Sequence, residues 1–404
     1  SAICVRTPQD VFDLWRNEHG LSDPSLPAEI WRIQEELERD LDASVTPEST
    51  MGISNELAVK GGKAANTGGH LTTRYVKNCQ GVGQCLQGCR GGEKKSMNLT
   101  FVPETLQRGG TVVSCAQVKK IKVRRKRVVG VSGRFVHPMF RHYGARFTIR
   151  ARKAVVLGAS ATRSPALMLH SGIRSKALGK YFRAHPGTGV FGCYDDPVDQ
   201  NIGATQGWAS IKFRQDGLKL ETLSIPLALV AGRLKGGGRI LMERLREYRH
   251  MAMWCHAVRA TAVGQVTSSI FGNPVVKYSL NQRDMRTFRH GMVLVSKTHF
   301  AAGASAIIPG VHGLPYRLGP DELHQLEDGP LDPRAYTAIL SHLFGGCVMG
   351  TDSRRAVCDP HGRVYGYDGL VVVDASVIPT TLGVNPQHTI MALARFFSER
   401  LLDS

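Results

Sequence analysis

Two side chains in the last third of the chain, His342 and Asn385, stand in patterns that could support chemistry. A neutral imidazole can accept a proton near neutral pH because its unperturbed pKa is about 6.5. Asn385 and Pro386 open a helical pattern, in which Asn can cap the helix and Pro suits its first position. Backbone amides at such a helix start can face an electron-rich ligand oxygen. The alternative is an ordinary strand-turn-helix with a satisfied histidine nearby.

Three elements must position these side chains. His342 precedes a glycine-rich turn at residues 345–346. The apolar run 370–373 is typical of a short buried strand, and it ends at Asp374. The helix after Pro386 follows within a few residues. Spacing alone does not distinguish a functional site from a structural one.

This stretch resembles the C-terminal signature of the glucose-methanol-choline (GMC) flavoprotein oxidoreductases. The pattern H-x-x-G-G-C-x-M-G from His342 to Gly350, and G-V-N-P from Gly383 to Pro386, are similar to the cholesterol oxidase and long-chain fatty alcohol oxidase branches. The resemblance continues upstream in the block G-C-x-x-G-x-K-x-S at residues 88–96 and in the strand at residues 154–157. Residues 185–278 are a looser match.

The resemblance implies oxidation of a CH–OH group of a long-chain or sterol-type alcohol, with FAD as the cofactor. It assigns His342 as the base and Asn385 as its partner on the substrate hydroxyl. The residues that it places against FAD are Val118, Asp374, Ala375, Asn385 and Pro386. Other interpretations stay open: His342 as a structural histidine, and Asp374 as a plain helix cap. His388 matches no catalytic position and is expected to pack.

Cholesterol oxidases also use a glutamate of the substrate domain. Glu221, Glu243 and Glu247 are present in the corresponding half of this chain, but none of them aligns convincingly. The sequence therefore assigns no carboxylate to the site.

The dinucleotide fingerprint G-x-G-x-x-G, which lets the backbone approach a pyrophosphate, follows no strand in the 404 residues. The family's A-A-G-A turn is replaced by Gly158-Ala159-Ser160-Ala161. We therefore expect a separate or additional N-terminal FAD-binding polypeptide as a partner. The alternative is a degenerate, non-catalytic structural subunit of a larger multi-chain complex, for example a mitochondrial one.

The composition indicates a large hydrophobic core in about two domains, with 404 residues and 42% hydrophobic content. The net charge of +19 suggests an anionic surface or an acidic partner subunit. The densest basic run, Lys119 to Arg127, is most simply a solvated hairpin. Nucleic acid is disfavoured because aromatic residues do not interleave with this run. No apolar run reaches the roughly 18 residues of a membrane span, so we expect a soluble or peripheral protein.

Nine cysteines, an odd and scattered number, favour a reducing intracellular compartment, and the basic composition also fits mitochondria. Cys79, Cys85 and Cys89 are grouped in a glycine-rich segment and could ligate zinc or an iron-sulfur cluster. A fourth ligand is not evident, so no metal is predicted.

The predicted fold is α/β plus α+β: a partial FAD-binding Rossmann-like domain joined to an antiparallel-sheet substrate domain. We expect the FAD-binding part to cover residues 1–184, with a long loop at 44–89. The substrate domain then covers 185–340, and residues 341–404 return to the FAD-binding domain.

Overall fold

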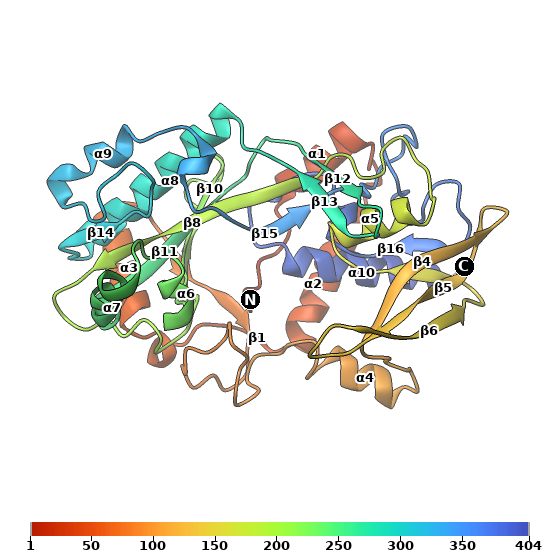
Figure 1. Cartoon of the computed structure of the whole chain (residues 1–404), viewed down its shortest axis with the longest axis horizontal. Helices are drawn as coiled ribbons and strands as arrows, with labels where there is room; N and C mark the ends of the chain where they lie inside the picture. The colour runs from red at the N-terminus through yellow and green to blue at the C-terminus, as the bar shows by residue number, and fades with distance from the viewer. Residues whose placement is uncertain (1, 403–404) are drawn as a thin grey trace.

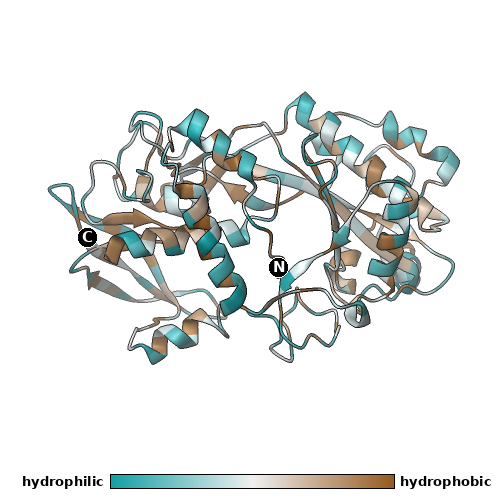
Figure 2. Ribbon diagram, turned by 180° about the vertical axis from the view of Figure 1, so that it is seen from behind, coloured by the Kyte–Doolittle hydropathy of each residue, from teal (hydrophilic) through white to brown (hydrophobic). Residues whose placement is uncertain are grey.

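Two lobes lie side by side in the computed structural model, which describes residues 2–402 (Figure 1). Each lobe has a hydrophobic core of its own. The first core gathers Trp15, Ile33 and Phe396, and the second gathers Trp254 and Phe288 with their apolar neighbours. Figure 2 shows the apolar residues concentrated on the strands and the inner sides of the helices in both lobes.

The first lobe contains the helices α1 (Gln9–His19), α2 (Leu26–Asp40) and α10 (Gln387–Leu402). Its central pair of strands, β7 (Val155–Leu157) and β16 (Leu370–Val372), is parallel. The helix α5 (Arg163–His170) follows β7 directly. A parallel pair with flanking helices is the pattern expected of a partial Rossmann-like domain.

A three-stranded antiparallel sheet packs beside this pair. It consists of β4 (Ala116–Arg124), β5 (Arg127–Val136) and β6 (Tyr143–Arg150). The basic run predicted as a hairpin is therefore β4 and the start of β5. Its turn lies at Arg125 and Lys126, whose φ angles are 50° and 63°. Positive φ at two successive residues suits a tight two-residue turn.

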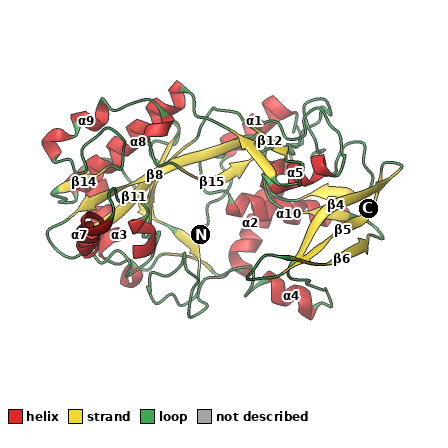
Figure 3. Cartoon of the chain, in the orientation of Figure 1, coloured by secondary structure: helices red, strands yellow, loops and turns green. Residues whose placement is uncertain are grey.

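The second lobe is built on a seven-stranded antiparallel sheet in the order β14-β8-β11-β10-β9-β2, with β15 also paired to β8. Figure 3 shows β8, β11, β14 and β15 of this sheet in yellow. The strands are β2 (His70–Leu71), β8 (Arg183–Cys193), β9 (Trp208–Ser210), β10 (Leu218–Thr222), β11 (Met251–Val258), β14 (Ala306–Ile308) and β15 (Ile339–Phe344). The long helix α8 (Gln282–Ala301) covers the sheet, and Asn281 caps it by accepting from the amide of Asp284. This sheet confirms the predicted antiparallel fold class.

Strand β8 connects the two lobes. Its first residues pair with β15, and its later residues pair with β11 and β14. The domain limit expected between residues 184 and 185 falls within this strand. The lobes are therefore continuous through the backbone hydrogen bonds of one strand.

The segment 44–89 differs from the expected long loop. In chain order, it contains the end of β1 (Ala43–Val45), then α3 (Ile53–Ala64), β2 and β3 (Thr73–Tyr75). Strands β1 and β3 pair with each other. Helix α3 packs on α8, and β2 adds to the sheet of the second lobe. Gly61 looked like a loop residue, but a Cβ there would lie 2.2 Å from the carbonyl oxygen of Thr298. The glycine allows the two helices to pack closely.

Smaller elements complete the fold. They are α4 (Phe101–Gln107), α6 (Leu227–Ala231), α7 (Gly238–Arg246), α9 (His324–Glu327), and the hairpin of β12 (Gln265–Ser268) with β13 (Pro274–Lys277). Among residues 2–402, no helix combines the length and the apolar character that crossing a bilayer requires.

The glycine turn after β15 should be sensitive to substitution. Gly345 has a φ of 76°, and a Cβ there would lie 1.9 Å from the carbonyl oxygen of Tyr181. We expect Gly345→Ala to lower the free energy of unfolding by about 1 kcal/mol for the left-handed backbone and by a further ~1–3 kcal/mol for the clash. Gly366→Ala is the matched control, because its φ is 75° and its surroundings are open. Equal losses in urea denaturation would contradict the close approach at Gly345.

Candidate active site

His342 lies on β15, where that strand meets β8 at the junction of the lobes. A register irregularity between Leu340 and His342 sets His342 opposite His185, and their ring centroids are 5.6 Å apart. Burial lowers the pKa of His342 to about 4, against the opposing pull of the nearby Glu221 carboxylate. The imidazole is therefore neutral at physiological pH and able to accept a proton.

Lys219 and Glu221 lie on β10 and face the same side of the sheet, because side chains two residues apart on a strand share a face. Lys219 Nζ lies 2.6 Å from Glu221 Oε2, and the two side chains are only 5% and 9% exposed. Burial acts to raise the pKa of Glu221, but the Lys219 ammonium outweighs it and lowers that pKa below its usual value. The pair is thus ionised in a dry environment.

Asn385 joins this ion pair from the first lobe. Lys219 Nζ donates to Asn385 Oδ1, and Asn385 Nδ2 lies 3.4 Å from Glu221 Oε2 as a donor. These contacts fix the orientation of the amide and leave its second N–H for another acceptor. The side chain of Asn385 therefore contacts the buried charges of Lys219 and Glu221 instead of capping the following helix, as the sequence had suggested. The helix α10 begins two residues later, at Gln387.

The loop that carries Asn385 is held by further cations of the second lobe. Arg214 donates to the carbonyl oxygen of Leu382 at 2.8 Å, and Arg259 donates to that of Thr381 at 3.3 Å. Both guanidinium groups also pair with Asp10 of α1 at 2.9 Å. The loop 381–385 is therefore positioned by contacts between the lobes as well as by its own sequence.

His185 holds the adjacent backbone. The amide of Gly383 donates to His185 Nε2 at 3.0 Å, so this nitrogen is unprotonated. Burial holds the pKa of His185 well below its usual value, with His342 and Lys219 adding to the effect. His185, Lys219, His342 and Gly383 line one small cavity. The structure thus brings together the predicted residues His342 and Asn385 with a charged pair that the sequence did not assign.

Glu221 is the carboxylate that the sequence could not select. Glu243 and Glu247 lie on the surface and pair with Arg239 and Arg317. The alternation of apolar and charged residues at 218–222 could have indicated Glu221. In a strand, this pattern places Lys219 and Glu221 together on one face and the two leucines on the other. Their pairing with Asn385, more than 160 residues away, had no local sequence signal.

Asp374 and Ala375 lie where β16 ends. The carboxylate of Asp374 accepts from the amides of Ser160, at 3.0 Å, and Ser376, at 2.8 Å, and also from the hydroxyl of Ser164. It therefore caps the short helix that starts at Ala375 and ties the turn after β7 to the end of β16. The carbonyl oxygen of Ala375 accepts from Gly345, which links this turn to the end of β15. The proposed cofactor contacts of both residues remain predictions.

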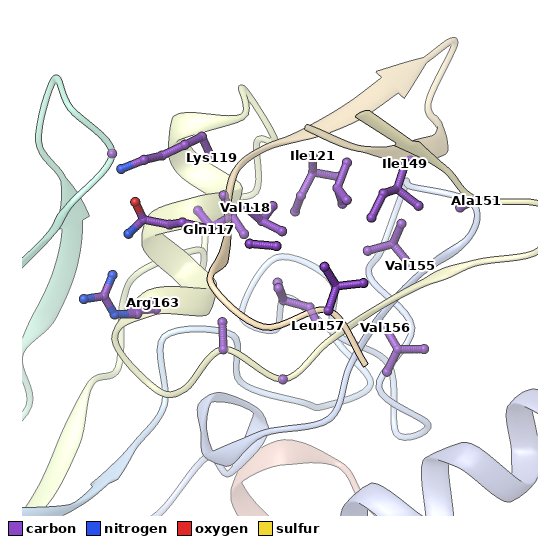
Figure 4. A pocket seen from close by; sticks show the side chains of 18 of the residues that line it. Gln117, Val118, Lys119, Ile121, Ile149, Ala151, Val155, Val156, Leu157 and Arg163 are labelled. Carbon is purple, nitrogen blue, oxygen red and sulfur yellow. The ribbon is translucent and has the colours of Figure 1, made fainter. Parts of the chain in front are cut away.

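Val118 lines a groove of about 990 Å³ on the outer side of the first lobe (Figure 4). One wall is the three-stranded sheet, including Ile121 and Ile149, and the floor is β7 with Leu157. Strand β7 pairs with β16 along one edge, and Val156 on this strand is 47% exposed. The second edge of β7 has no strand beside it within residues 2–402.

The structure does not gather the ligand atoms of Cys79, Cys85 and Cys89 within 4.8 Å of one another. Cys89 Sγ instead lies 2.8 Å from a carboxylate oxygen of Glu93. In the described part of the chain, the residues with ligand atoms close enough to share a metal are Cys4, Glu38 and His388. Arg6 already pairs with that glutamate at 2.7 Å, and Tyr75 hydrogen-bonds the His388 ring. His388 is thus buried in a protein network, as expected for packing.

Comparison with known proteins gives this geometry a context. Family models of the N- and C-terminal parts of GMC oxidoreductases match residues 1–187 and 260–394. A GMC-type oxidoreductase of Sinorhizobium fredii is 29% identical over 100% of this chain and 78% of its own length. One of Mycobacterium tuberculosis is 30% identical over 98% of the chain, and a long-chain-alcohol oxidase of Arabidopsis thaliana is 24% identical over 100%. The chain spans only 61% and 56% of the latter two.

Solved structures share the fold at low identity. Pyridoxine 4-oxidase superposes with a TM-score of 0.72 at 14% identity, and a formate oxidase variant studied for FAD modification superposes with 0.75 at 15%. Both cover 100% of this chain, which covers 82% of each of them. These structures confirm the predicted fold, and the two family models confirm the predicted family. The FAD named for formate oxidase agrees with the predicted cofactor.

The buried ion pair predicts an asymmetry between single and double variants. Lys219→Met leaves Glu221 buried without its counter-ion and should lower the free energy of unfolding by about 3–5 kcal/mol. The double variant Lys219→Met with Glu221→Met should lose much less, because no unpaired charge remains. Urea denaturation measures both. The two residues would not be coupled if the double variant lost as much free energy of unfolding as the single variants Lys219→Met and Glu221→Met lose together.

Proposed function

Because this chain belongs to the GMC oxidoreductase family, we propose that it takes part in FAD-dependent oxidation of the CH–OH group of a long-chain or sterol-type alcohol. The observation that carries the proposal is the meeting of His342 and Asn385 around the buried Lys219–Glu221 pair. A neutral base, an oriented amide and a dry, charged surrounding are what removal of a hydroxyl proton requires.

We assign the roles by position. His342 accepts the hydroxyl proton, since its ring is neutral and lines the small cavity. Asn385 holds the hydroxyl through its free amide N–H, because Lys219 and Glu221 occupy its other groups. Lys219 keeps Glu221 ionised and lowers the pKa of His342, so it acts through the other residues and is a positioning residue.

FAD would accept the hydride from the carbinol carbon when bound. The residues present fit such a group at two places. The first place is the groove beside Val118, which has apolar walls and a volume large enough for the nucleotide part of FAD. The second place is the start of α10, after Pro386. The amides of the first turn of a helix have no acceptor within the helix, so they can donate hydrogen bonds to an electron-rich oxygen of the flavin ring.

The open edge of β7 supports a further part of the proposal. A two-stranded parallel sheet is unusual because parallel sheets are normally larger and covered on both faces. We propose that a strand from an N-terminal FAD-binding polypeptide adds to β7 beside the groove. A glycine-rich turn of that polypeptide would contact the pyrophosphate of FAD.

An apolar substrate is supported by a cavity of about 730 Å³ in the second lobe. Its apolar lining comes from Met51, Val59, Leu71 and Trp208, and the exposed charged residues Glu48, Glu56 and Lys63 line it together with His70. In the sheet register, Glu221 lies opposite Ala209, which in turn lies opposite His70. These three side chains therefore share one face of the sheet, and His70 is the member of this row that also lines the cavity. Leu71 and Trp208, which lie opposite each other in the next row, face the other side of the sheet.

Replacing the proposed base should stop the chemistry without removing the cofactor. His342→Gln keeps a polar side chain but cannot take up the proton, so alcohol-dependent bleaching of the flavin absorption should slow by about 10²–10⁴-fold. Single-turnover absorption with a long-chain alcohol measures it in the flavin-containing protein. The exposed His324→Gln serves as the control and should keep the normal rate. A colourless native protein that does not take up FAD would refute the proposal.

The pH profile should report the pKa of His342. The neutral imidazole is the active form, so kcat/KM should stay high above that pKa and fall as the pH drops through about 4. The Glu221 carboxylate raises this pKa. Glu221→Gln should therefore move the acid limb to lower pH, whereas the exposed Glu243→Gln should leave it in place. An acid limb that moves upward in Glu221→Gln would contradict the assignment.

A further inference from the structure

The excess positive charge of the chain is confined to one segment. Residues 105–194 contain 19 Lys and Arg residues and no Asp or Glu. The remaining 33 basic residues equal the 33 acidic residues of the whole chain, so this segment accounts for the net charge of +19. Within residues 2–402, its ion pairs are those of Arg108 with Glu104 and of Arg127 with Asp368. Most of the segment's cations therefore have no acidic partner in the fold.

The three-stranded sheet concentrates this charge on one face. In the register of β4, β5 and β6, Lys120 lies in one row with Ser132 and Thr148, and Lys122 lies in the next row with Gly130 and Arg150. A third row sets Arg134 directly opposite Arg146. Because residues two apart share a face, these basic side chains all lie on the same side.

Like charges set opposite each other in a sheet are destabilising. The opposite face of the same sheet carries Ile121, Val131 and Ile149 and lines the groove beside Val118. The basic side chains of Lys120, Lys122, Arg134 and Arg146 therefore lie on the side away from the proposed cofactor groove, and the two surfaces meet at Arg150, which also lines the groove. The repulsion on the basic face would be relieved by a ligand that presents many negative charges across a plane.

Exposed apolar residues lie at one end of this sheet. The connection from β5 to β6 presents Met139 and Phe140, which are 76% and 72% exposed. The turn from β12 to β13 presents Ile270 and Phe271, which are 86% and 73% exposed. Both connections border the mouth of the same groove, through Arg141 and Tyr143 on one side and residues 272–273 on the other.

These two features select one class of partner. A nucleic acid would match the charge, but it offers no apolar phase for four exposed side chains on two separate turns. The Tyr143 ring beside the basic face is already in contact with Lys119 and Arg134, and Phe140 stacks on the rings of His137 and His142 rather than among the cations. An anionic bilayer offers negative head groups for the basic face and hydrocarbon for the turns. The chemistry of both features together therefore favours a lipid surface.

We propose that the β4–β5–β6 sheet and the turns at 139–140 and 270–271 form a docking surface for anionic membranes. The basic face attracts the acidic head groups, and Met139, Phe140, Ile270 and Phe271 enter the interface. Docking of this kind would place the groove beside the membrane, the layer in which long-chain alcohols dissolve. The inference does not depend on catalysis, because binding to vesicles is measured without turnover.

Cosedimentation of the full chain with lipid vesicles tests the proposal. We expect binding to an equal mixture of phosphatidylcholine and phosphatidylglycerol, weak binding to phosphatidylcholine alone, and loss of binding as salt is raised. Phe140→Ser combined with Phe271→Ser, and separately Lys120→Glu combined with Arg146→Glu, should each weaken binding by a factor of about ten or more. All four positions are solvent-exposed, so folding should be preserved and is checked by circular dichroism.

A matched control distinguishes this surface from a second basic and apolar element. Helix α7 exposes Ile240 and Arg239 on the other lobe, so Ile240→Ser combined with Arg239→Glu should leave vesicle binding unchanged. Loss of binding in that control would overturn the proposed location. Vesicle binding that persists in the Phe140 and Phe271 variant but falls in the charge variant would indicate a general polyanion site, and it would overturn the membrane assignment. Equal affinity for phosphatidylcholine alone would overturn it as well.

Discussion

The buried ion pair of Lys219 and Glu221 is the constraint around which the candidate site is organised. Two charges in a dry environment are tolerated only when they are paired and their remaining hydrogen-bonding groups are satisfied. Asn385 supplies those contacts from the other lobe. The requirement to satisfy the pair therefore fixes both the rotamer of Asn385 and the distance between the lobes at this point. His342, opposite His185 on neighbouring strands, inherits its position from the same junction.

The two lobes contribute unequally to this junction. The second lobe supplies cations, namely Lys219, Arg214 and Arg259, and the first lobe supplies the carbonyl and amide oxygens of the loop 381–385. Asp10 balances the two arginines. Such a network is directional and screened from solvent, so it holds the loop more firmly than apolar packing alone would. A rigid amide and a neutral imidazole are useful for proton removal because neither has to reorganise when the charge develops.

In the first lobe, one side of the parallel strand pair is covered by packed side chains and the other side is exposed. Helices α2 and α10 pack on each other, and Val372 of the parallel pair is buried in the same core as Ile33 and Phe397 of these helices. Beyond β7, by contrast, lie the groove and exposed apolar side chains such as Val156. An exposed strand edge with apolar neighbours is a template for strand addition. The basic face of the three-stranded sheet is a second surface of this lobe whose groups lack partners. Repulsion between its like charges is unfavourable for an isolated molecule, and so is the exposed edge of β7.

Much of the fold was predictable from local patterns. The apolar run at 370–373 predicted β16, and the resemblance predicted β7 and the antiparallel second lobe. Helix α3 was not predicted, because Gly61 and Gly62 lower helix propensity. The backbone of α8, which needs that close approach, lies more than 200 residues away. Helix α8 itself also went unrecognised, since its polar residues obscure the apolar face that packs on the sheet.

The sequence by itself determined the family signature and, with it, His342 and Asn385, because these residues stand in short motifs that can be read without knowing what surrounds them. Only the tertiary structure decided that Glu221, rather than Glu243 or Glu247, joins them, and that Lys219 accompanies it. The physical reason is that the charge state and orientation of a buried polar group depend on its neighbours in space. Those neighbours come from strands and loops whose separation in the chain carries no local pattern.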